Sequence, residues 1–142
     1  MLSPRAQVAL LRFLQDHSYR PVGGTASRTA NVRVVDRADH VALMATTDLV
    51  VTHAGLGTLA VALSSGVPVV CAPIDRDQPL NASRVVELGA GIALDDTTPA
   101  AIAAAVEAAL GYERYATAAR AVAEASAAEG GAASAAKAIL GD

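Results

Sequence analysis

Short apolar segments alternate along this chain with longer stretches of helical spacing. Residues 48–53 and 67–72 are apolar on both faces and bounded by turn residues, as the buried strands of a parallel sheet are. Shorter strands are predicted at residues 19–24, 32–35 and 91–94. The alternation predicts an α/β fold, a Rossmann-like parallel sheet with helices on both faces.

The predicted helices fill the gaps between these strands. One begins at Thr98, because a threonine cap followed by Pro99 is typical of a helix start. In this helix Ile102, Val106 and Leu110 share one face at helical spacing. The remaining helices are expected at residues 6–15, 58–65, 80–88, 113–128 and 132–140.

The most distinctive stretch is residues 50–58, where an apolar run ends on a histidine and a tight glycine turn leads into a helix. This order brings a side-chain donor and several free backbone N–H groups to one point, which suits a phosphate. The glycines would let the backbone approach the phosphates, and Thr58 would both cap the helix and donate its hydroxyl. Purely structural roles for the histidine and the glycines are the alternative. The candidate diphosphate contacts are His53, Gly55, Leu56, Gly57 and Thr58.

A second polar segment follows the next predicted strand. Asp77 and Gln78 fall just past residues 67–72, at the carboxyl edge of the sheet, where open α/β sheets bind their ligands. A carboxylate beside an amide suits sugar hydroxyls, which both donate and accept hydrogen bonds. The alternative is that Asp77 only caps the following helix.

These motifs occur in a recognisable order: His-x-Gly-x-Gly-Thr at residues 53–58, Gly-Val-Pro at 66–68 and Asp-Gln-x-x-Asn-Ala at 77–82. The order and spacing resemble the donor-binding half of the GT-B glycosyltransferases, in the branch with the UDP-glucuronosyl and macrolide-type transferases. The resemblance runs from about Asn31 to about Gly91. It implies an inverting transferase domain in which the glycine turn contacts the diphosphate of a UDP- or dTDP-sugar, while Asp77 and Gln78 contact the sugar.

No metal or other cofactor is expected at this site. No carboxylate pair stands beside the glycine turn, since Asp48 lies at the other end of its strand. Preorganised donors at a helix N-terminus, together with His53, would hold the charge of the departing diphosphate instead.

The chain departs from the family pattern at several positions. Val61 stands where many members carry a glutamate that binds the ribose. Residues 37–40 replace a segment whose tryptophan stacks on the base. Arg37 and Ala38 are therefore candidate base contacts, with a guanidinium stacked on a pyrimidine and a solvated loop charge as equal alternatives.

By this resemblance, we expect residues 1–142 to lack the family's opening strand and its N-terminal acceptor-binding domain. Since the catalytic base of this branch lies in that N-terminal domain, we assign no catalytic residue here, and His17 and His40 match no such motif. An N-terminal domain or a partner chain would supply the base. A sheet without its central strand would expose an edge, which makes a homodimer possible.

Length and charge narrow the picture further. A length of 142 residues predicts one domain over residues 1–142, which the resemblance implies is a nucleotide-sugar-binding domain. A net charge of −3 gives no reason to expect nucleic acid as a partner. No apolar stretch reaches the roughly 20 residues of a membrane span, and the N-terminus lacks the layout of a signal peptide, so a cytoplasmic protein is expected. Cys71, the single cysteine, is expected to be a buried strand residue.

Two other functions stay open at this point. The chain could be a non-catalytic or degenerate nucleotide-sugar-binding module. It could also be an NAD-binding domain, because residues 55–60 fit the dinucleotide fingerprint and Asp75 stands about 20 residues further on. The NAD interpretation is the weakest, since the fingerprint strand usually comes first in its fold and nothing in it explains His53 or Asp77.

Overall fold

The computed structural model describes residues 18–19, 28–29 and 35–141. The chain divides into two units, Met1–Ala38 and Asp39–Asp142, each of which is described by itself. In the first unit β1 (Ser18–Tyr19) pairs antiparallel with β2 (Arg28–Thr29). The predicted helix at 6–15 lies outside the described residues, as do most of the strands predicted at 19–24 and 32–35. A single domain over residues 1–142 stays a prediction.

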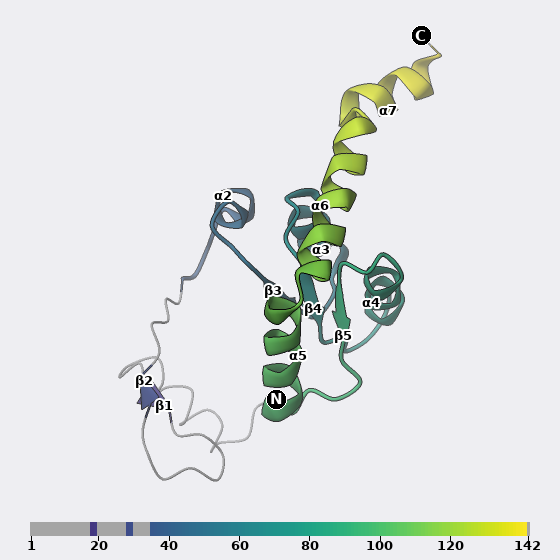
Figure 1. Cartoon of the computed structure of the whole chain (residues 1–142). Helices are drawn as coiled ribbons and strands as arrows, with labels where there is room; N and C mark the ends of the chain where they lie inside the picture. Colours follow the sequence, from purple (N-terminus) through teal and green to yellow (C-terminus); the bar gives the residue numbers. More distant parts are fainter. Residues whose placement is uncertain (1–17, 20–27, 30–34, 142) are drawn as a thin grey trace. The chain divides into compact units, whose positions relative to one another are not determined.

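The centre of the second unit is a parallel sheet of three strands in the order β3-β4-β5 (Figure 1). Its strands are β3 (Val50–Thr52), β4 (Val69–Cys71) and β5 (Gly91–Ala93). Each strand lies inside the segment that the sequence predicts for it, but is shorter. The α/β class with a parallel sheet is therefore confirmed.

Strand β4 runs through the middle of this sheet, and all three of its side chains are fully buried. Because successive side chains of a strand point to opposite faces, Val69 and Cys71 enter one core while Val70 enters another. This explains why the segment reads as apolar at every position rather than at alternate ones.

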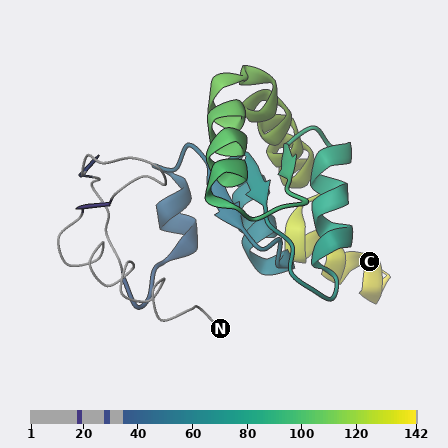
Figure 2. The same cartoon turned by 90° about the horizontal axis from the view of Figure 1, so that it is seen from below.

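Helices cover both faces of the sheet, as predicted. On the face of Val69 and Cys71, the core is completed by buried residues of three helices, α2 (His40–Met44), α3 (Leu56–Ser64) and α4 (Gln78–Glu87). On the face of Val70, α5 (Pro99–Gly111) contributes Ala105 and Ala109. Figure 2 shows α5 and the helix that follows it running side by side.

The last two helices differ in how much they bury. α6 (Glu113–Ala128) packs against α3 and α5, and its Ala119 is fully buried. α7 (Gly131–Leu140) has no buried residue and extends beyond the sheet toward the C-terminus (Figure 1). Both helices begin and end within one residue of the predicted ranges.

Helix α5 begins at the predicted cap, and its most buried residues are alanines. Thr98 is its N-cap, accepting a hydrogen bond at Oγ1 from the Ala101 N–H at 3.3 Å. The buried face, however, is formed by Ala105 and Ala109, whereas Leu110 is 55% exposed. Ile102 and Val106 are half-buried, so the alanines form the most buried part of this helix beside Val70.

The sequence analysis missed helix α2, and it also missed the two-residue strand β2. The N-cap of α2 is Asp39, whose carboxylate accepts a hydrogen bond from the Ala42 N–H at 3.1 Å. An aspartate before an apolar run is a helix-start signal, but five residues are too few for a visible helical period.

Cys71 is a buried strand residue, as expected. Burial raises the pKa of its thiol to about 11, so the thiol stays protonated at neutral pH.

Among the described residues β3 pairs only with β4, and the homodimer stays a prediction. No helix within the described residues has the length and apolar character to cross a membrane.

Candidate functional site

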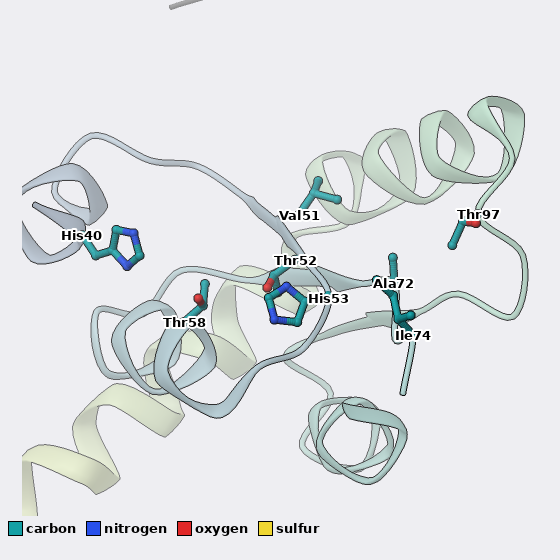
Figure 3. Close-up of a pocket in the computed structure, with 8 residues that line it drawn as sticks. All are labelled: His40, Val51, Thr52, His53, Thr58, Ala72, Ile74 and Thr97. Atoms are coloured by element: carbon teal, nitrogen blue, oxygen red, sulfur yellow. The ribbon is translucent and has the colours of Figure 1, made fainter. Parts of the chain in front are cut away.

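An open hollow of about 580 Å³ lies at the carboxyl ends of the parallel strands (Figure 3). Its volume falls in the range of about 300–1,000 Å³ that is usual for ligand clefts, and its place at the strand ends is where open α/β sheets bind ligands. The lining side chains come from α2, β3, the turn after β3, α3 and the segments after β4 and β5. They are His40, Val51, Thr52, His53, Thr58, Ala72, Ile74 and Thr97.

A tight turn after β3 places the His53 ring in this hollow. The next residue, Ala54, is fully buried and has a φ of 68°, a left-handed conformation that is uncommon for a residue other than glycine. Gly55 has an ordinary φ of −65°, so this position does not require glycine for backbone freedom. A Cβ there would lie 2.8 Å from the His53 Nε2, so a larger residue would push the exposed His53 ring aside.

The first turn of α3 presents backbone donors at the same place. The Leu59 N–H is the first that bonds back into the helix, to the Gly55 carbonyl at 3.1 Å. The three preceding N–H groups, of Leu56, Gly57 and Thr58, are those that a helix start leaves without intrahelical partners. Gly57 is exposed, with no atom within 4 Å of where its Cβ would be, so a ligand can approach the backbone here.

The predicted capping role of Thr58 is wrong. Helix α3 begins two residues before the predicted start at residue 58, so Gly55 is the N-cap and no side chain caps the helix. Thr58 is the third helical residue, half-buried, and lines the hollow. Its hydroxyl stays a candidate donor to a ligand.

Polar side chains of the loop after β4 form hydrogen bonds with other groups of the same segment. The Gln78 Oε1 accepts hydrogen bonds from the N–H groups of Ile74 at 2.8 Å and Asp75 at 3.1 Å, which closes the loop. Asp77 occupies the N-cap position of α4 but makes no capping hydrogen bond. Its Oδ2 instead accepts a hydrogen bond from the Asn81 Nδ2 at 2.9 Å.

The sequence profile of one family, described as "Erythromycin biosynthesis protein CIII-like, C-terminal domain", matches residues 14–140. The chain belongs to this family of GT-B glycosyltransferase C-terminal domains. The resemblance seen in its motifs is thereby confirmed, and it argues against the NAD interpretation.

Individual relatives agree with this assignment. The vancomycin aglycone glucosyltransferase of Amycolatopsis orientalis is 38% identical over 91 residues, which are 63% of this chain and 22% of that protein. The solved structure of the glycotransferase of kitacinnamycin superposes with a TM-score of 0.72 at 36% identity, covering 78% of this chain and 29% of that one. The spinosyn rhamnosyltransferase SpnG complexed with thymidine diphosphate gives a TM-score of 0.54 at 29% identity, covering 58% and 23%. The chain thus spans less than a third of each relative.

The structure of this GT-B domain distinguishes among the predicted contacts. His53 and Thr58 line the hollow, with Thr58 on α3 and the ring of His53 at the turn (Figure 3). Asp77 and Gln78 stand at the same end of the sheet without lining the hollow. Arg37 and Ala38 are exposed residues of the first unit, so their role as base contacts stays a prediction.

Sequence reasoning also missed side chains that line the hollow of this domain. Thr97 follows β5 just as Ile74 follows β4, so its place after a predicted strand was the available signal. His40 reaches the hollow from α2, a helix that was not predicted. Within residues 35–141 and the two short strands, no three acidic, histidine or cysteine side chains gather as metal ligands do. A metal-free site stays a prediction.

Proposed function

We propose that this domain is the donor-binding half of an inverting glycosyltransferase, holding a UDP- or dTDP-sugar for transfer to an acceptor hydroxyl. One observation carries the proposal: the first turn of α3 meets the same hollow as the His53 ring, through Thr58. The backbone donors of this turn and a ring N–H of His53 would then face one ligand at the carboxyl edge of the sheet.

This arrangement suits the charge that develops during transfer. As the bond between the sugar and the diphosphate breaks, negative charge grows on the departing phosphate oxygens. Donors that are already in place stabilise that charge without reorganisation, and the positive end of a helix dipole adds to them. The N–H groups of Leu56 and Gly57 and the His53 ring would supply these donors.

The loop after β4 would contact the sugar. Because the Gln78 Oε1 is held by two backbone N–H groups, its amide NH₂ group is the part that remains for a ligand. The Asp77 carboxylate is exposed, and its oxygen not bonded to Asn81 can accept from a sugar hydroxyl. Arg37 and Ala38 would contact the pyrimidine base of the nucleotide.

The rest of the reaction would need residues that we assign to another domain. An N-terminal acceptor-binding domain, on the same protein or on a partner chain, would deprotonate the acceptor hydroxyl. The relative SpnG was solved in complex with thymidine diphosphate, which supports a pyrimidine diphosphate as the leaving group here.

Calorimetric titration tests this function directly. The folded chain is titrated with UDP, dTDP and NADH in parallel, each with and without EDTA. We expect micromolar binding of a pyrimidine diphosphate that EDTA leaves unchanged. Preferential binding of NADH would contradict the proposal. Absence of binding by all three, from a chain shown to be folded by circular dichroism, would favour a degenerate module instead.

A further inference from the structure

We propose that Asn81 is a positioning residue that fastens the turn after β3 to the start of α4, so that the diphosphate and sugar contacts share one geometry. The part that concerns ligands rests on the proposed function. The part that concerns the turn rests on the structure alone.

The Asn81 side chain bridges two loops that are far apart in the sequence. Its Nδ2 donates to the Ala54 carbonyl, 27 residues away, at 3.0 Å, and to the Asp77 Oδ2 at 2.9 Å. An amide nitrogen carries two hydrogens, so both bonds can form at once. The bond to the Ala54 carbonyl is partly buried, which shields it from competing water, whereas the bond to Asp77 is exposed.

Ala54 is the residue that most needs such a bridge. A left-handed backbone is disfavoured for alanine, and it persists where surrounding contacts over-determine it. The Ala54 N–H donates to the Thr52 Oγ1 at 3.3 Å, and its carbonyl accepts from Asn81. Hydrogen bonds therefore hold the peptide groups on both sides of this residue.

Loss of the Asn81 bridge would move the hydrogen-bond donors for the diphosphate, because it would change the conformation of the turn after β3. Without Asn81, Ala54 can relax toward an ordinary φ, which rotates the peptide bond that joins it to Gly55. The His53 ring lies where a Gly55 side chain would be, and the first turn of α3 follows directly. Both sets of diphosphate donors would shift together, while Asp77 would lose the partner that orients its carboxylate.

The first test needs no ligand. We compare the amide ¹H–¹⁵N signals of Gly55 and Gly57 in the unmodified chain, in Asn81→Ala and in Asn81→Asp, which replaces the donor by an acceptor of the same shape. Both variants should shift these signals. Ser83→Ala is the control, because its hydroxyl bonds the Pro79 carbonyl on the same helix and does not reach the turn. Unshifted Gly55 and Gly57 signals in a folded Asn81→Ala would overturn the proposal.

The second test measures affinity and a rescue. Asn81→Ala should weaken binding of the free pyrimidine diphosphate about tenfold, as losing a net hydrogen bond would. Adding Ala54→Gly removes the cost of the left-handed backbone and should restore part of that affinity. If Asn81→Ala weakened diphosphate binding only by destabilising helix α4, Ala54→Gly would not restore the affinity. If Asn81→Ala does not fold, recovery of folding by Ala54→Gly supports the bridge, and no recovery overturns it.

The two proposals fail differently. If the unmodified chain binds no diphosphate, the proposed function fails, yet the amide signals still decide the role of Asn81. If the diphosphate binds and Asn81→Ala leaves both the signals and the affinity unchanged, only the positioning role is lost.

Discussion

The two loops that follow β3 and β4 prepare for a ligand in different ways. The turn after β3 has a buried, left-handed Ala54 and offers backbone N–H groups through glycines and the start of α3. The loop after β4 is exposed and relies on Asp77 and Gln78, each of which already bonds within its own segment. A site built from backbone depends on space and on a fixed turn. A site built from side chains depends on their identity.

Removing the His53 ring should give the largest effect. His53→Ala is expected to weaken binding of the free diphosphate by about 1.5–3 kcal/mol, because a hydrogen bond to a charged group is lost. Calorimetric titration with UDP and dTDP measures it. His40→Ala, the other histidine on the hollow, should cost less. Unchanged affinity in His53→Ala would remove His53 from the diphosphate site.

Asp77→Ala should distinguish the binding role of the loop after β4 from that of the turn after β3. We expect it to weaken binding of the sugar nucleotide by about 1.5 kcal/mol and to spare the free diphosphate, since the carboxylate would contact only the sugar. Parallel titrations with both ligands give the difference. Asp75→Ala removes the same charge from the same loop and is the matched control. Equal losses for both ligands would show that Asp77 acts on the structure of the loop.

Gly57→Ala should separate stability from binding. A methyl group has open space here, and alanine favours a helix, so the free energy of unfolding should stay equal or rise by up to about 1 kcal/mol. The same methyl group would stand where the phosphates approach, and affinity should fall by about 1 kcal/mol, less than the loss of a charged hydrogen bond. Gly111→Ala, at an equally open helical position, is the control for denaturation and titration. Unchanged affinity would place the diphosphate elsewhere.

The smallest expected effect is on the loop after β4. Gln78→Ala removes the acceptor for the Ile74 and Asp75 N–H groups and should lower the free energy of unfolding by about 1 kcal/mol or less, because water can replace it in this exposed loop. Gln78→Glu keeps the acceptor and should be nearly neutral. Urea denaturation distinguishes them, and equal stability of all three proteins would deny Gln78 its role in closing the loop.

Most of the framework of the second unit follows from local sequence. The strands β3, β4 and β5 lie inside their predicted segments because buried parallel strands are apolar at every position. The Thr98 cap was predictable since its hydrogen bond reaches only as far as Ala101. Helix α2 escaped prediction because its five residues are held by contacts with α3 rather than by a long apolar period.

Local sequence also brought His53 and Thr58 to one end of the sheet, because a strand, a short turn and a helix leave little choice of path. Tertiary structure decided what local patterns cannot express. The space beside Gly55 is taken by His53, the small face of α5 meets Val70, and Asn81 reaches a carbonyl 27 residues away. Each of these depends on distances between segments that the chain brings together only after it folds. The sequence therefore determined which groups reach the carboxyl edge, and packing determined how they are held there.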